Sequence, residues 1–290
     1  MGEYIIMTDS SCDLPASLAE KMELTVLPLY VDVNGQRYTN YLDEREIKFS
    51  EIYAKLRTKC PAKTSAVNMN DFMEVMAPIL DGGKDILYIG FSSGLSSTYD
   101  AGAMAARELT ERWPDRKIYA VDSLCASMGQ GLLVYLAWQQ KQLGRTIEEV
   151  RDYVEGNKLH LCHWFTIDDL MFLKRGGRIS GATAIVGSML SIKPVMHVDN
   201  DGHLIKVSTA RGRKASIKAL ADEAAKRGVD LENQTIFISH GDCLEEANFL
   251  ADIMRSRFKV KDVVVNYVGP VIGAHSGPGT IALFFLGTER

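Results

Sequence analysis

The first half of the chain repeats one order of apolar and polar positions. Short apolar runs at residues 4–7, 86–91 and 118–121 are each followed by a loop that contains serine and then by a helical pattern. Strands that alternate with helices predict a parallel sheet, and such sheets bind ligands beyond the carboxyl ends of their strands. We therefore expect the three serine loops to lie together at one edge of the sheet. In the first loop, Asp13 is placed to cap the helix that follows.

The second half has a different pattern. Residues 167–180 predict a helix that ends at a glycine pair, and residues 181–191 predict a helix of small residues. Two alternating runs within residues 193–209 surround an Asn-Asp-Gly turn, which is typical of a hairpin. Further apolar runs predict a helix from Arg213 and strands at 235–240, 260–268 and 280–287. These elements together indicate an α+β layer with a mixed sheet.

The change of pattern predicts an α/β protein of two domains. Residues 1–158 are expected to form an N-terminal three-layer α/β/α domain around the parallel sheet. Residues 159–290 are expected to form a C-terminal two-layer α+β domain with the mixed sheet. The chain has 290 residues, of which 46% are hydrophobic and 24% charged, so two domains with apolar cores are within its reach.

Charge and cysteine usage narrow the class of protein. The net charge of −4 gives no basic face for a nucleic-acid partner. The five cysteines are odd in number and never in CxxC spacing, so we interpret them as reduced thiols, not as disulfides or zinc ligands. The first ten residues lack the basic and apolar regions of a signal peptide. A cytoplasmic protein is therefore expected.

Residues 263–288 contain no Asp, Glu, Lys or Arg and are numerous enough to span a bilayer. Pro270, Pro278 and five glycines interrupt this stretch, however, and a membrane helix through them would leave backbone groups without partners. We interpret the stretch as two buried strands joined by a glycine- and proline-rich loop. That loop carries His275.

The segment GFSSG at residues 90–94 matches the nucleophile elbow G-x-S-x-G after a strand and before a helix. With Ser92 as nucleophile, His275 as base and an acid such as Asp199 or Asp242, the chain order fits a serine acyl hydrolase. Against this hypothesis, few strands precede the elbow, whereas the hydrolase sheet is largely complete at that point.

The same loop also suits anion binding. Four serines, at positions 92, 93, 96 and 97, stand where a helix begins. The free backbone N–H groups and the dipole of a helix N-terminus favour a carboxylate or a phosphate. Capping of the helix explains one of these serines but not four.

Two other segments carry polar groups that suit an anion. Thr64 and Ser65 lie in a polar loop at residues 61–68 and are hydroxyl donors of the kind that bind a carboxylate, although a solvated loop explains them equally. Arg178 follows a Gly-Gly turn, and two other cations, Lys174 and Arg175, precede that turn. Its guanidinium could bind a phosphate through two hydrogen bonds, or these cations could complement a helix C-terminus.

Arg211, Arg213 and Lys214, followed by Lys218, form the one basic cluster of the chain. A solvated helix start explains the cluster, and a docking patch for an acidic partner or a membrane surface is the functional alternative. His160 and His163 would point to opposite faces of a strand, so a metal site there is not expected.

Seven motifs in order resemble the DegV family, the fatty-acid-binding proteins of bacteria. They are TDSSCDLP, TSAVN, SSGLSSTYDAG, VDS, LKRGGRISG, IKPV and GPVIGAHSGPGTIALFF, and they extend over essentially the whole chain. The resemblance implies a two-domain binding protein without catalytic activity that buries a long-chain fatty acid between its domains. Some members are similar to the binding subunit of bacterial fatty acid kinase, which presents the acid to a separate kinase subunit.

The resemblance also implies roles for individual residues. The carboxylate ligands would be Thr64, Ser96 and His275, with Ser65 and Ser93 as near alternatives. Arg178 would lie by the head group. The cluster of Arg211, Arg213 and Lys214 would be the kinase docking face, and transient contact with a membrane surface is compatible with it. The apolar tunnel would be lined by residues 181–192 and 280–286, and no metal or cofactor is implied.

Two other functions remain open at this point. One is the acyl hydrolase with Ser92 and His275. The other is a phosphosugar or dihydroxyacetone-type binding protein, because related two-domain folds bind small polar ligands. In that case a polar pocket would replace the apolar tunnel.

Overall fold

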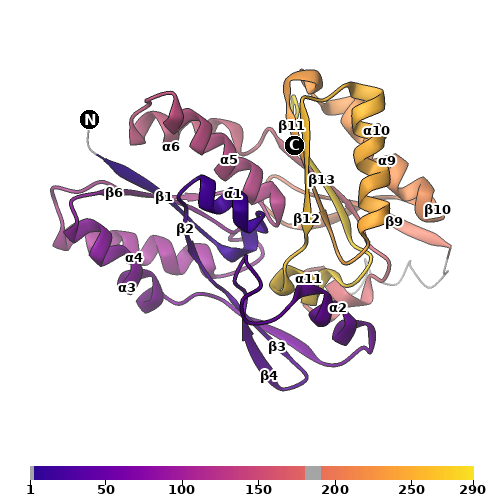
Figure 1. Cartoon of the computed structure of the whole chain (residues 1–290), viewed down its shortest axis with the longest axis horizontal. Helices are drawn as coiled ribbons and strands as arrows, with labels where there is room; N and C mark the ends of the chain where they lie inside the picture. Colours follow the sequence, from indigo (N-terminus) through magenta and orange to yellow (C-terminus); the bar gives the residue numbers. More distant parts are fainter. Residues whose placement is uncertain (1–2, 180–190) are drawn as a thin grey trace.

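A four-stranded parallel sheet forms the centre of the first half of the protein. The computed structural model describes residues 3–179 and 191–290 (Figure 1). The strand order is β2-β1-β6-β7, with β1 at Tyr4–Asp9, β2 at Thr25–Leu27, β6 at Asp85–Gly90 and β7 at Ile118–Asp122. Every residue of β6 is buried, as expected for a parallel strand covered by helices on both faces.

Helices cover both faces of this sheet, so the predicted three layers are confirmed. Helices α3 (Met69–Asp81) and α4 (Thr98–Arg112) pack on the face that carries Met7, Ile86 and Tyr88. The opposite face carries Ile6, Leu87 and Ile89 and packs against the remaining helices. These are α1 (Ala16–Lys21), α5 (Met128–Gln142) and α6 (Ile147–Asn157).

A small antiparallel sheet beside the parallel one was not predicted. Its order is β4-β3-β5, with β3 at Tyr30–Val33, β4 at Gln36–Thr39 and β5 at Ala62–Ser65, and helix α2 (Phe49–Arg57) lies between β4 and β5 in the chain. The prediction of a polar loop at residues 61–68 is therefore wrong for β5. This strand is short and has no apolar alternation, so its pairing with β3, and not its own sequence, makes it a strand.

The second half contains the predicted mixed sheet. Its six strands have the order β10-β9-β8-β13-β11-β12. Their bounds are Leu161–Thr166 for β8, Ile192–Val198 for β9, Leu204–Arg211 for β10, Thr235–His240 for β11, Asp262–Tyr267 for β12 and Ile281–Leu286 for β13. β9 and β10 form the predicted hairpin.

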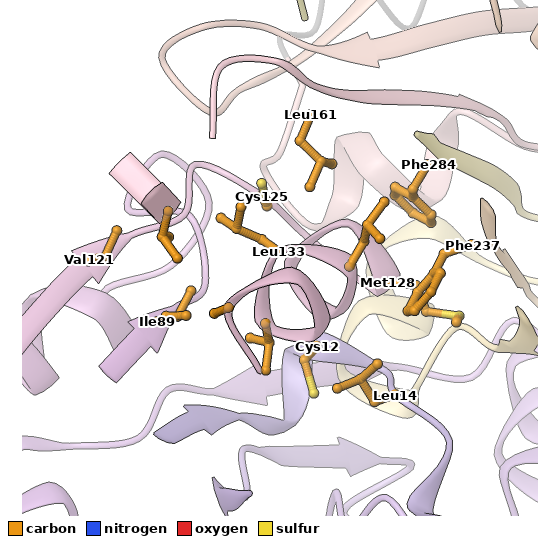
Figure 2. Packing of buried hydrophobic residues seen from close by; sticks show 14 of the residues in the cluster. Cys12, Leu14, Ile89, Val121, Cys125, Met128, Leu133, Leu161, Phe237 and Phe284 are labelled. Atoms are coloured by element: carbon orange, nitrogen blue, oxygen red, sulfur yellow. The ribbon is translucent and has the colours of Figure 1, made fainter. Parts of the chain in front are cut away.

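The two faces of the mixed sheet are covered differently. Helices α9 (Arg213–Arg227) and α10 (Leu244–Phe258) cover one face. The other face packs against α5 of the first half, and Figure 2 shows Phe237 and Phe284 of the sheet next to Met128 of α5. The domain division predicted between residues 158 and 159 lies in the connection from α6 to β8. Because one apolar core joins both halves, the division remains a prediction.

The segment that carries His275 is a helix and not the predicted loop. Helix α11 extends over Pro270–Ser276, with proline at its first position and Gly277 after its end at a φ of 82°. Proline at the start and a left-handed glycine after the end are favourable helix boundaries. Helix α7 (Met171–Arg175) ends at the glycine pair, as predicted, and lies beside α11.

The short 3-10 helices are η1 (Ser10–Cys12) and η3 (Leu231–Asn233). The predicted small-residue helix at 181–191 lies almost entirely outside the described residues. None of the helices within 3–179 and 191–290 has the length and apolar character needed to cross a membrane.

Candidate ligand-binding cavity

The three serine loops meet at the carboxyl edge of the parallel sheet, as predicted. The carboxylate of Asp9, at the end of β1, accepts a hydrogen bond from the N–H of Phe91 at 3.0 Å. In the third loop, the hydroxyl of Ser123 donates to the carbonyl of Gly90 at 2.6 Å. These buried bonds hold the loops in one place beyond the ends of the strands.

A cavity of about 240 Å³ lies between this edge and the inner face of the mixed sheet. Its wall is mostly apolar and includes side chains from both halves of the protein. Leu95, Phe165, Leu173, Ile272 and Phe284 are examples. Concave, mostly apolar cavities with a few polar groups are typical of small-molecule sites.

Thr64 and His275 form a pair at this cavity although 211 positions separate them in the chain. The Oγ1 of Thr64, on β5, lies 2.7 Å from the Nε2 of His275, on α11. Burial, together with the positive charge of Arg178, lowers the pKa of His275 to about 4. The imidazole is therefore neutral at pH 7, with one nitrogen that donates and one that accepts.

Gly176 allows the end of α7 to approach the imidazole closely. A Cβ at this position would lie 2.2 Å from the Nδ1 of His275, a distance that no real contact shows. That nitrogen is buried and has no hydrogen-bond partner among the described residues. The absence of a side chain at Gly176 thus allows the end of α7 to pack directly against the imidazole of His275.

Arg178 brings a positive charge to the same cavity. Its Nε and Nη2 donate to the carbonyl of Leu95, at 3.3 and 3.1 Å, and its Nη1 donates to the carbonyl of Gly176. Within residues 3–179 and 191–290 no carboxylate pairs with it, and burial lowers its pKa. A half-buried guanidinium bonded to neutral carbonyls favours an anion nearby.

The serines that were expected at the site have different positions. Ser65 and Ser96 line the cavity, and the hydroxyl of Ser96 shares a 2.9 Å hydrogen bond with that of Thr98. Ser93 is exposed and is absent from the lining, while its N–H donates to Asp122 at 3.2 Å. Ser93 therefore does not accompany the other candidates.

The catalytic pair of the hydrolase hypothesis is not assembled. The hydroxyl of Ser92 is completely buried, donates to the carbonyl of Gly202 at 2.9 Å and accepts from the N–H of Gly94. His275 is paired with Thr64 instead. The candidate acids are also used elsewhere, because Asp199 binds backbone N–H groups of the β9–β10 turn and Asp242 pairs with Arg57 and Tyr267.

The basic cluster is only partly available for a partner. Arg211 and Lys214 are exposed. Arg213 instead forms an ion pair with Glu246 at 3.0 Å and lies 3.7 Å from Asp168. Its charge is largely neutralised within the C-terminal half, so the exposed charge of the predicted patch comes from the other two residues.

Comparison with known proteins places the chain in a family. The model of the family described as "Uncharacterised protein, DegV family" matches residues 4–288. The chain belongs to the DegV family. A DegV domain-containing protein from Clostridium perfringens is 45% identical over 290 residues, which is 100% of this chain and 99% of the relative.

Solved DegV structures have the same fold. A DegV family protein from Thermus thermophilus, reported for its fatty acid binding, has a TM-score of 0.86 at 30% identity and covers 98% of this chain and 99% of its own. A DegV lipid binding protein from Thermotoga maritima has a TM-score of 0.87 at 27% identity, with 99% of each chain covered.

Several buried polar groups of this DegV chain line its cavity without having been predicted to do so, and two of them matter most. Ser127, with a left-handed φ of 54°, has its hydroxyl 2.6 Å from a carboxylate oxygen of Asp13 and 3.0 Å from the hydroxyl of Ser239. Asp13 does not cap α1 as predicted, because its carboxyl group is buried against Ser127, which in turn contacts Ser239 of the second half. This burial raises the pKa of Asp13 to about 8. His163 is the second group, and its place in an apolar strand gave no signal of a cavity.

Proposed function

We propose that this protein binds one long-chain fatty acid in the cavity, with its carboxylate at Thr64, Ser96 and His275. The observation that carries the proposal is a mostly apolar cavity whose neutral donors lie beside Arg178, which has no carboxylate partner among residues 3–179 and 191–290. The fatty acid and lipid binding of the Thermus and Thermotoga relatives supports the same ligand class.

The acyl tail and the head group of the ligand contribute differently to the binding free energy. Burial of an acyl chain contributes roughly 0.8 kcal/mol per methylene, which is on the order of 10 kcal/mol for a long chain. A hydrogen bond to a charged group contributes about 1.5–3 kcal/mol. The apolar wall therefore provides most of the affinity, and the donors at Thr64, Ser96 and His275 fix the position of the carboxylate.

The neutral state of His275 suits a carboxylate ligand. Its Nε2–H and the Thr64 hydroxyl can both donate to the carboxylate oxygens once the bond between them is exchanged for bonds to the ligand. Ser65 lies next to Thr64 in the lining as a further donor. Arg178 supplies the complementary positive charge, and no carboxylate of the described residues competes for it.

The same proposal makes the protein a cytoplasmic carrier that does not transform its ligand. A separate fatty acid kinase would phosphorylate the presented carboxylate, and the exposed charges of Arg211 and Lys214 would contact that kinase or, transiently, a membrane surface. Reversal of both charges, Arg211→Glu with Lys214→Glu, should reduce phosphorylation by such a kinase and leave the affinity for palmitate unchanged. Unchanged phosphorylation would remove the docking role.

Lipid analysis of the purified protein tests the proposed ligand. Protein from a bacterial host should carry a co-purified fatty acid, seen by native mass spectrometry and by extraction. Protein that carries none and takes up neither palmitate nor oleate would contradict the proposal. Labelling by a fluorophosphonate that is lost in Ser92→Ala would instead establish the hydrolase, and we expect no such labelling because Ser92 is buried.

A further inference from the structure

His163 lies in the wall of the same cavity but away from the head-group residues. It belongs to β8, is 1% exposed, and neither of its ring nitrogens has a hydrogen-bond partner among the described residues. A buried polar group without a partner costs about 1–3 kcal/mol. Such groups are rare in folded proteins, and one that lines a ligand cavity indicates a partner that arrives with the ligand.

The register of the sheet places His163 far along the cavity. His163 pairs with Phe284 of β13, and the side chains of Phe165, Ala282 and Phe284 line the cavity on the same face. Thr280, four residues before Phe284, bonds the carbonyl of Gly277 at the end of α11. At about 3.4 Å per residue, His163 is level with a point roughly 14 Å along β13 from the helix that carries His275.

Packing holds the imidazole at this place. A Cβ at position 129 would lie 2.0 Å from the Nε2 of His163, so the glycine at the start of α5 is what leaves room for the ring. The ring of Phe284 packs against it at 5.3 Å with the planes nearly perpendicular. The burial of His163 lowers its pKa well below 6.5, so the ring is neutral and has one donor and one acceptor.

Two other buried hydroxyl groups of the cavity wall are already hydrogen-bonded. Ser127 and Ser239 share a 3.0 Å hydrogen bond, and Ser127 also contacts Asp13. Two further lining atoms, Ser276 Oγ and His275 Nδ1, also lack a hydrogen-bond partner among the described residues, but both belong to α11 at the head-group end. On the mixed-sheet side of the cavity, His163 is the lining residue without a partner in the described part of the chain.

We propose that His163 is a second polar subsite of the cavity, and that it binds a hydroxyl group carried in the acyl chain of the ligand. A hydroxyl both donates and accepts one hydrogen bond, as a neutral imidazole does. Rotation of the ring by 180° about the Cβ–Cγ bond exchanges the positions of each nitrogen and a ring carbon. The bound ligand can therefore determine which ring atom faces the cavity. The inference rests on the proposed fatty-acid site and specifies its ligand as a chain hydroxylated at a distance from the carboxylate.

Binding of two matched acids tests the subsite. The probes are octadecanoic acid and 10-hydroxyoctadecanoic acid, measured on delipidated protein by displacement of a fluorescent fatty acid. The wild-type protein should bind the hydroxy acid at least as tightly as octadecanoic acid. In His163→Phe, which keeps a flat ring but no nitrogen, the hydroxy acid should bind at least tenfold more weakly than octadecanoic acid, because its hydroxyl then lacks a partner.

Two controls separate this effect from a change in folding. His197→Phe alters a histidine that stacks on Trp164 at 4.9 Å and does not line the cavity, and its preference should equal that of the wild type. A 3-hydroxy acid, with its hydroxyl near the carboxylate, should show no response to His163→Phe. The affinity for octadecanoic acid checks that the cavity is intact in each variant.

The outcomes also distinguish the subsite from the proposed function. If the wild type binds octadecanoic acid but rejects the hydroxy acid tenfold or more, the subsite is refuted while the fatty-acid proposal stands. An equal preference in the wild type and in His163→Phe refutes it as well, because His163 would then hold only a fixed water molecule. If neither acid binds, the proposed function itself fails.

Discussion

Gly176→Ala is a sensitive test of how the head-group residues are positioned. The added Cβ would lie 2.2 Å from the Nδ1 of His275, whereas ordinary contacts begin at 3.4 Å, so the imidazole must move by the difference of 1.2 Å. A movement of this size is not compatible with the 2.7 Å contact to Thr64. The φ of −72° at Gly176 is accessible to alanine, so the substitution acts through the histidine and not through backbone strain.

The expected effect is a loss of affinity with little loss of stability. One hydrogen bond to the carboxylate contributes about 1.5–3 kcal/mol, which corresponds to a Kd for palmitate raised roughly 10- to 150-fold. Displacement of a fluorescent fatty acid measures the Kd, and thermal unfolding measures the stability. Gly156→Ala is the matched control, because a Cβ there meets no atom within 4 Å. A Kd for Gly176→Ala within twofold of the wild type would refute the positioning of His275.

Two further predictions concern the contact between the two halves. Burial raises the pKa of Asp13 to about 8, so the carboxyl group keeps its proton in the folded protein at pH values where the unfolded chain has released it. The free energy of unfolding should therefore fall between about pH 4 and pH 8 and stay constant at higher pH. Urea unfolding at pH 5 and pH 7.5 should show a smaller fall in the free energy of unfolding for Asp13→Asn than for the wild type. An identical fall in both proteins would contradict the assignment of the pH dependence to Asp13. Arg290 is buried and donates to the carbonyls of Leu124 at 2.7 Å and Asp199 at 3.0 Å, which belong to different halves of the protein. Arg290→Leu should therefore lower the free energy of unfolding by about 2–4 kcal/mol. A change below about 0.5 kcal/mol would contradict the role of Arg290 in joining the two halves.

Local patterns were sufficient for the parts of the fold in which each strand or helix shows its own periodicity. The buried runs around β1 and β6 and the Asn-Asp-Gly hairpin of β9 and β10 belong to this class. The small sheet could not be predicted in the same way. β5 has no apolar alternation, and its conformation comes from pairing with β3, which lies about thirty residues earlier in the chain.

In the candidate site, too, local motifs predicted some features, whereas features that depend on distant parts of the chain could not be predicted. Thr64, Ser96, Arg178 and His275 were named from motifs, and the structure places all four in the cavity wall. Whether a side chain faces the cavity depends on the backbone direction, which separated Ser96 from the exposed Ser93. Partners distant in sequence also could not be predicted, such as the carboxylates that engage Arg213.

A crystal structure of the protein with palmitate tests the central claim most directly. The account predicts a carboxylate oxygen within about 2.7–3.2 Å of both the Thr64 Oγ1 and the His275 Nε2, with the acyl chain extending along β13 toward Phe284. A carboxylate at the Phe284 end, or palmitate bound outside the cavity, would contradict it.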